Sequence, residues 1–142
     1  MDFTLTEETD DESVQEAIRR GIRSADPPDV GKRDYQPLTL ALRAPDRSLV
    51  GGVYGATMWG WLMVEGLWVS QEVRGRGLGR RLMLAAEAAA VERGCRGVWL
   101  GTFDFQARAF YERLGYTVFA QLPDFPASHT HYHLSKQLVA SE

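Results

Sequence analysis

The sequence predicts a single α+β domain with a mixed β-sheet over residues 1–142. Two observations lead to this fold class. Three apolar runs between residues 38 and 70 are separated only by short turns, which is typical of an antiparallel meander. After residue 78, helix-forming and strand-forming runs alternate, which brings further strands into the same sheet. No repeat, low-complexity tract or linker divides the sequence.

The first elements expected are a short strand at residues 2–5 and a helix. Thr9 and Glu12 have the spacing of a capping box, which predicts a helix start. The helix should end before residues 26–28, because proline disfavours helical geometry in the residue before it. Apolar residues recur at helical spacing in between, at Val14, Ala17, Ile18 and Ile22.

The meander follows a polar loop at residues 26–36. A turn at residues 45–48 and a second turn at Trp59-Gly60 separate its apolar runs. The expected strands are residues 38–43, 49–58 and 61–70.

A helix is expected over residues 80–93, which are rich in alanine, leucine and arginine and are followed by Gly94. A stripe of small apolar groups should lie on the sheet, formed by Leu78, Leu82, Ala85, Ala86 and Ala89. The remaining elements expected are a strand at residues 97–102, a helix at 107–114, and strands at 116–122 and 130–138.

Composition narrows the functional classes. The net charge of −3 argues against a nucleic-acid-binding protein, which needs a basic face. No apolar run approaches the roughly 20 residues of a membrane helix. The acidic start "MDFTLTEETDDE" is unlike a signal peptide, and Cys95, the single cysteine, has no partner for an internal disulfide. We therefore expect a cytoplasmic location, no membrane partner, no nucleic acid, and a structural role for Cys95.

Positive charge gathers in "VRGRGLGRRL", residues 73–82, which carries four arginines. Its glycines at positions 75, 77 and 79 fit neither the dinucleotide pattern nor the P-loop pattern. A glycine turn that opens a helix directs backbone N–H groups and the positive end of the helix dipole at one point, which suits a pyrophosphate. The alternative is a glycine-rich turn with solvated arginines.

Two motifs make the chain similar to a known family. Arg74, Gly77 and Gly79 match the signature R/Q-x-x-G-x-G/A, after the strand-like "VEGLWVS". The stretch "ARAFYERLGY", residues 107–116, matches a later helix motif. The chain thus resembles the GNAT superfamily of acyl-CoA-dependent N-acetyltransferases. The resemblance implies a GNAT-like fold with splayed central strands and acetyl-CoA as co-substrate.

The resemblance also implies a coenzyme site. Backbone groups of residues 67–69 would pair with the pantetheine arm, and residues 73–80 would hold the pyrophosphate. Asp104 stands where the family often has asparagine, so it either contacts the coenzyme or caps the following helix. The implied coenzyme-binding residues are Leu67, Trp68, Val69, Arg74, Gly75, Arg76, Gly77, Leu78, Gly79, Arg80, Asp104, Ala107 and Tyr111.

Two residues are candidates for the chemistry. By resemblance, Tyr111 would protonate the leaving thiolate. Glu65 shares a strand face with Leu67 and Val69 if the alternation is regular, so it is either the base for the amine or a polar residue of that face. The resemblance implies no metal.

Three histidines alternate in "HTHYHL" at positions 129, 131 and 133, which would place them on one strand face. No carboxylate or cysteine is spaced to complete a metal site with them, so a role for one of them as an acceptor-site residue or base is more plausible than a metal site. Trp61 is the tryptophan to examine for substrate stacking.

The sequence predicts direct transfer to a primary amine of a cationic small molecule or peptide. The acceptor should lie between residues 26–36 and 121–129, whose loops carry Asp29, Asp34 and Asp124. A catalytically inactive acyl-CoA sensor is the alternative, because the coenzyme motif does not depend on the base. The resemblance also allows a homodimer through the C-terminal strands.

Overall fold

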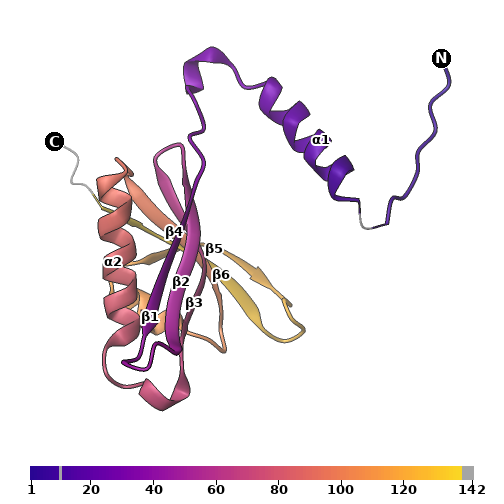
Figure 1. The fold of residues 1–142 in the computed structure, drawn as a ribbon. Helices are drawn as coiled ribbons and strands as arrows, with labels where there is room; N and C mark the ends of the chain where they lie inside the picture. The colour runs from indigo at the N-terminus through magenta and orange to yellow at the C-terminus, as the bar shows by residue number, and fades with distance from the viewer. Residues whose placement is uncertain (10, 139–142) are drawn as a thin grey trace. The chain divides into compact units, whose positions relative to one another are not determined.

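The computed structural model describes residues 1–9 and 11–138 (Figure 1). Contacts divide the chain into two units, residues 1–32 and residues 33–142. The expectation of one domain over the whole chain stays a prediction. None of the described helices is both long and apolar enough to cross a lipid bilayer.

The first unit contains the helix α1 (Glu12–Ser24) and the short 3₁₀ helix η1 (Pro28–Val30). The helix ends before the two prolines, as predicted. The predicted capping box is wrong, because Asp11 caps the helix: its carboxylate accepts hydrogen bonds from the backbone N–H groups of Ser13 and Val14. The carboxylate of Asp11 stands directly before the first turn, where it reaches two N–H groups that have no partner within the helix.

The predicted strand at residues 2–5 is also wrong. These residues have no strand assignment and pair with no neighbouring strand. An extended segment becomes a strand only when a neighbour satisfies its backbone groups, so alternation of side chains alone is insufficient.

The second unit is built on a six-stranded mixed sheet in the order β1-β2-β3-β4-β6-β5. The pair β3 and β4 is parallel and the other neighbouring pairs are antiparallel. This arrangement confirms the predicted α+β class and the meander. The strands are β1 (Gln36–Arg43), β2 (Leu49–Met58), β3 (Trp61–Val69), β4 (Gly97–Phe103), β5 (Thr117–Pro123) and β6 (Thr130–Gln137). The helices are η2 (Gln71–Val73), α2 (Leu78–Glu92) and α3 (Arg108–Arg113).

The parallel strands β3 and β4 pair over four residues and then part. Their last pair joins Val64 to Leu100, although β3 continues to Val69 and β4 to Phe103. On the other side of β3, the register with β2 shifts at a β-bulge, because Tyr54 pairs with Gly66 while Gly55 pairs with Val64. The predicted splay of the central strands is thus present, and Glu65 is the residue that the bulge leaves unpaired.

Helix α2 lies along one face of the sheet and covers β1 to β4 (Figure 1). Its buried residues are Leu82, Met83, Ala86, Glu87 and Ala90. The predicted stripe is therefore displaced: Ala85 is exposed, and the buried face includes a carboxylate. A methyl-sized Ala85 gains little from burial, whereas Met83 and Glu87 find partners beneath the helix.

Glu87 is the centre of a buried polar network. Its carboxylate accepts hydrogen bonds from the Tyr116 hydroxyl at 2.8 Å and the Lys136 ammonium at 2.9 Å. Tyr116 is 1% exposed, and burial together with the hydrogen bond to Glu87 raises its pKa. The network joins α2, the segment after α3, and β6, so it fixes three elements relative to one another.

The substitution Tyr116→Phe removes one donor from this network. We expect it to lower the free energy of unfolding by about 1–3 kcal/mol, because a buried carboxylate oxygen loses its hydrogen bond. Chemical denaturation measures the change. Tyr35→Phe is the control: Tyr35 is 62% exposed, and its substitution should change stability by less than about 0.5 kcal/mol. Equal stability of the two variants would show that the network contributes nothing.

Candidate functional site

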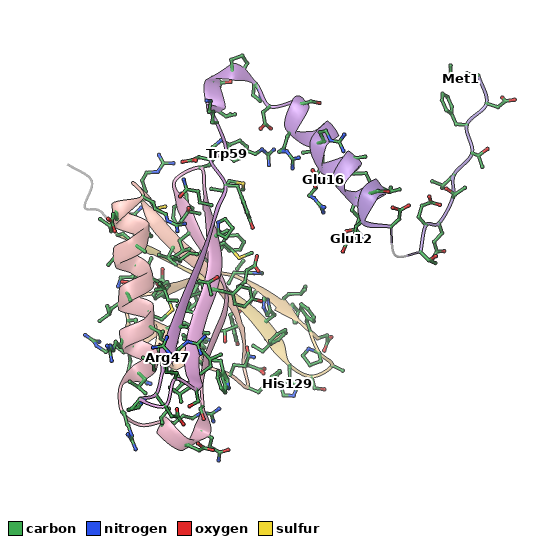
Figure 2. All side chains as sticks on the ribbon, in the orientation of Figure 1. Met1, Glu12, Glu16, Arg47, Trp59 and His129 are labelled. Carbon is green, nitrogen blue, oxygen red and sulfur yellow. The ribbon has the colours of Figure 1, made fainter. Side chains whose placement is uncertain are left out.

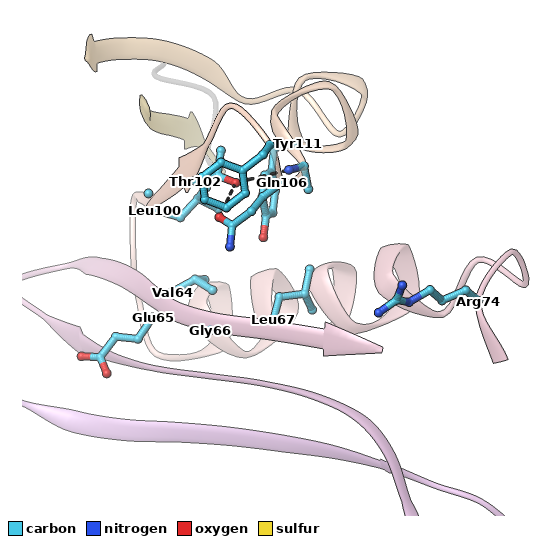
Figure 3. Close-up of a pocket in the computed structure, with 12 residues that line it drawn as sticks. Val64, Glu65, Gly66, Leu67, Arg74, Leu100, Thr102, Gln106 and Tyr111 are labelled. Atoms are coloured by element: carbon cyan, nitrogen blue, oxygen red, sulfur yellow. Dashed lines mark hydrogen bonds between the residues drawn. The ribbon is translucent and has the colours of Figure 1, made fainter. Parts of the chain in front are cut away.

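A cavity of about 540 Å³ opens where β3 and β4 part (Figure 3). Glu65 to Leu67 on β3 and Leu100 to Thr102 on β4 form two of its sides. Tyr111 from α3 closes another side, and Arg74 lies at the end toward α2. Of the residues predicted from the sequence, the cavity brings together Glu65, Leu67, Arg74, Ala107 and Tyr111.

The parted strands leave one backbone edge open on each side of the cavity. Residues 66–69 of β3 pair only with β2, and residues 101–103 of β4 pair only with β6. A linear ligand that carries amide groups can bind between two such edges, because it supplies the hydrogen-bond partners of an added strand.

The glycine turn has the conformation that an anion site requires. Gly75 and Gly77 have φ angles of +81° and +73°, and a Cβ atom on either would meet nothing within 4 Å, so the approach is open. Gly77 is the N-cap of α2 and, as a glycine, supplies no side-chain capping bond to the first N–H groups of this helix. Arg74 is fixed at the turn, since its Nε donates to the Val69 carbonyl at 3.0 Å. The free N–H groups and the helix dipole favour an anion there.

Tyr111 is 7% exposed and lines the cavity. Burial raises the pKa of its hydroxyl to about 12. Among the residues that the structure describes, no group forms a hydrogen bond with this hydroxyl. The side chain therefore presents a protonated, unpaired hydroxyl at neutral pH.

Glu65 does not share a face with Leu67 and Val69, so that prediction is wrong. The bulge breaks the alternation: Val64 belongs to the buried core and Leu67 packs against it, while Glu65 is exposed. Figure 3 shows the Glu65 carboxylate directed away from Val64, Leu67 and Tyr111. Glu65 still lines the cavity, but its carboxylate is on the opposite face of β3.

Asp104 does not cap α3 in the structure. The N-cap of α3 is Ala107, which has no side-chain capping bond. The Asp104 carboxylate accepts from the Thr130 N–H at 2.9 Å and contacts His129 Nδ1 at 2.8 Å. Desolvation acts to raise the pKa of Asp104, but these hydrogen bonds together outweigh it, so the pKa lies below its ordinary value. Asp104 ties the end of β4 to the loop before β6.

The three histidines occupy two environments. His131 and His133 lie on one face of β6 with ring centroids 4.7 Å apart, whereas His129 precedes the strand and pairs with Asp104 (Figure 2). Residues 1–9 and 11–138 contain no group of three or more side chains placed to hold a metal ion. Trp61 lies apart from the cavity, in a second depression of about 330 Å³ with Trp99, Phe119 and Ser135.

Several cavity residues escaped prediction from the sequence. Gln106 holds the turn after β4, because its side-chain oxygen accepts from the Phe103 N–H at 3.0 Å. Phe105 belongs to the same turn and also lines the cavity. The sequence offers only one indication for Phe105 and Gln106, which is their position between a strand and a helix that both border the cavity. The unpredicted lining residues are Val64, Gly66, Leu100, Gly101, Thr102, Phe105 and Gln106.

Comparisons with known proteins agree with this arrangement. The family described as "Acetyltransferase (GNAT) family" matches residues 5–116. An acetyltransferase of Agrobacterium fabrum is 35% identical over 122 residues, 86% of this chain and 88% of that protein. Blasticidin-S acetyltransferase of Streptomyces morookaense is 48% identical over 91 residues, 63% of this chain and 67% of that protein. A crystal structure of a Bacillus cereus acetyltransferase has 28% identity and a TM-score of 0.84, covering 95% of this chain and 97% of that chain.

The fold, the cavity between parted strands and these matches define the protein as an acetyltransferase. Within that class, the chain belongs to the GNAT acetyltransferase family. The resemblance seen in the two sequence motifs is thereby confirmed.

The raised pKa of Tyr111 gives the protein a specific dependence on alkaline pH. The folded state favours the neutral phenol, so its stabilising contribution is complete below pH 10 and is lost as pH rises from 10 toward 12. We expect the free energy of unfolding to fall by about 2–3 kcal/mol more in the parent protein than in Tyr111→Phe over this range. Denaturant titrations at each pH measure it. Parallel curves for the two proteins would contradict the burial of an ionisable hydroxyl at this position.

Proposed function

We propose that the protein is an acetyl-CoA-dependent N-acetyltransferase that transfers the acetyl group directly to a primary amine. The observation that carries this proposal is a cavity with two open strand edges, the protonated hydroxyl of Tyr111 on one side, and Arg74, which directly precedes the glycine turn at the start of α2. The strand edges and the glycine turn suit the binding of a coenzyme, and the Tyr111 hydroxyl suits the protonation of its sulfur. Membership of the GNAT family supports the view that these features act in one reaction.

The residues present fit the coenzyme. The open edge of residues 67–69 suits the amide groups of pantetheine, and the turn from Arg74 to Arg80 suits the pyrophosphate. Leu67, Ala107 and Tyr111 line the cavity that would hold the thioester end. Asp104 is the weakest member of the proposed set, because its carboxylate is already bonded to His129 and Thr130.

Acetyl-CoA would supply the acetyl group as a thioester. A new C–N bond to the amine then replaces the C–S bond, so one proton must leave the amine and another must reach the sulfur. We assign to Tyr111 the donation of the proton that reaches the sulfur, because its hydroxyl lies in the cavity and retains its proton up to about pH 12. We assign to Glu65 the removal of the proton from the amine; its carboxylate is directed to the other face of β3. The two groups would thus act on opposite sides of the reacting carbon.

The acceptor class follows from charge. The net charge is −3 although four arginines gather in residues 74–81, so the rest of the protein is strongly acidic. Asp124 stands in the loop between β5 and β6, next to the end of β4 that Asp104 ties to it. A cationic amine, on a small molecule or a peptide, suits these surroundings. Similarity to an acetyltransferase named for blasticidin S supports a small molecule.

Thiol release from acetyl-CoA against a panel of amines tests the proposal, together with calorimetry of acetyl-CoA binding. Thiol release that depends on the amine supports N-acetyltransferase activity and identifies the class of acceptor. Binding without release from any amine would favour an acyl-CoA sensor, and absence of binding would overturn the coenzyme assignment.

For Tyr111→Phe we expect kcat to fall about 100-fold, because the leaving sulfur loses its proton donor. The dissociation constant of acetyl-CoA should stay within about twofold of the parent value, since the phenyl ring still forms the same side of the cavity. Tyr54→Phe serves as the matched control, because Tyr54 is 51% exposed on β2 and outside the cavity. A kcat within about twofold of the parent value would remove Tyr111 from the chemistry.

For Gly77→Ala we expect acetyl-CoA to bind about five- to thirtyfold more weakly. The left-handed backbone at this position costs an alanine about 1–2 kcal/mol, and the free turn relaxes away from the conformation that holds a pyrophosphate. Calorimetry measures the affinity. Gly21→Ala in α1, where a Cβ has free space and no positive φ, should leave it unchanged. Unchanged affinity in both variants would place the pyrophosphate elsewhere.

A further inference from the structure

A cluster of aromatic rings covers the sheet face opposite α2, at the end of β4. Phe103 is its centre: the Phe105 ring stacks on it with centroids 5.3 Å apart and planes 8° apart, and His131 lies at 4.4 Å. Phe125, from the loop between β5 and β6, makes an edge contact with Phe103 at 5.2 Å. We call these residues the ring cluster; its members are Phe103, Phe105, Phe125, His131 and His133.

Two rings of the ring cluster are exposed to an unusual degree for phenylalanine. Phe105 is 57% exposed and Phe125 is 46% exposed. Both side chains pack against Phe103, one face to face and the other edge to face, so they present apolar surface next to a partly covered ring. Preformed aromatic surface beside a cavity is typical of a binding site for a ring-shaped ligand.

The ring cluster is continuous with the cavity at Phe105 and Gly101. Phe105 lines the cavity and stacks in the cluster. Gly101 also lines the cavity, and the His131 ring lies so close to it that a Cβ atom would stand 2.6 Å from its Cε1 atom. Only backbone therefore separates the cavity from the rings at this point. Glu65, proposed above as the base, is directed to the same face of the sheet as the rings.

The ring cluster carries little charge. Burial and the neighbouring His133 lower the pKa of His131, which keeps that imidazole neutral at physiological pH. The ionisable groups nearest the rings are Asp104 and Asp124, which adjoin Phe103, Phe105 and Phe125 in the sequence, and His129, whose ring makes an edge contact with Phe105 at 5.0 Å. This surface suits an uncharged planar group, while Glu65 suits an ammonium group.

We propose that the ring cluster is the acceptor subsite and that it binds an amine joined to a planar aromatic or heteroaromatic ring, with the ring stacked on Phe105, in edge contact with Phe125, and the amine directed to the gap between β3 and β4. The proposal rests on the proposed N-acetyltransferase function. It narrows the acceptor from cationic amines in general to those with a flat ring.

Two probes of similar size test the subsite: 2-phenylethylamine, whose ring is planar, and 2-cyclohexylethylamine, whose ring is not. Their rates of thiol release are compared at equal concentrations of the neutral amine. We expect kcat/KM to be about three- to tenfold higher for the aromatic amine, as stacking energies allow. Equal values, or a preference for the saturated ring, would overturn the proposal.

The variant Phe105→Leu removes the stacking surface but keeps an apolar side chain. We expect it to raise KM for 2-phenylethylamine about three- to tenfold, and to leave KM for 2-cyclohexylethylamine and the affinity for acetyl-CoA within about twofold. Phe3→Leu is the control, because Phe3 is 85% exposed and belongs neither to the lining of the cavity nor to the ring cluster. Equal effects of the two variants, or equal effects of Phe105→Leu on the two amines, would contradict the subsite.

Calorimetry of amine binding to the protein saturated with coenzyme A distinguishes failure of the proposed N-acetyltransferase function from failure of the proposed acceptor subsite. Absence of thiol release from every amine would reject the proposed function. The subsite would then be supported by binding of 2-phenylethylamine that Phe105→Leu weakens. It would be rejected if the aromatic amine does not bind, or if Phe105→Leu changes only the oligomeric state, which would show that a second copy covers the rings.

Discussion

The organisation of this protein depends on the interruption of backbone hydrogen bonding between β3 and β4. The two strands pair only as far as Val64 and Leu100, and beyond that point each keeps one edge without a partner. Unpaired backbone groups are costly when they are buried, so the gap must remain accessible to water or to a ligand that replaces the missing strand. The cavity, the position of Tyr111 and the open face of Gly101 all follow from this parting.

The buried network at Glu87 keeps the walls of that gap in place. Helix α3 is only six residues long and could not hold its position by its own backbone bonds. Tyr116 and Lys136 join the segment after α3 and strand β6 to the middle of α2 through one carboxylate. Tyr111 is therefore buried against a rigid support, and this burial raises the pKa of its hydroxyl from the ordinary value of 10 to about 12.

Most elements were predictable because each has a local cause. Apolar runs and turns predicted the meander, and Gly94 predicted the end of α2. The failures concern interactions between distant residues. The bulge that turns Glu65 to the other face depends on how Tyr54 and Gly55 pair with β3, which no pattern within β3 reveals. The alternative that Asp104 caps α3 was wrong, because its partners stand 25 and 26 positions later, while its contact with the coenzyme stays a prediction. Glu87 resembles a solvent-facing helix residue until Tyr116 and Lys136 are placed beneath it.

The absence of a side chain at Gly101 has a consequence for how such a protein evolves. At Gly101 only the backbone of β4 separates the cavity and Tyr111 on one side from the rings around His131 on the other. The glycine turn and α2 belong to the first side, while Phe103 and the loop containing Phe125 belong to the second. Among the rings only Phe105 also lines the cavity, so the other side chains of the second set can change without altering the lining of the cavity. A lineage can therefore exchange one face of the sheet by a few substitutions while it inherits the other face unaltered.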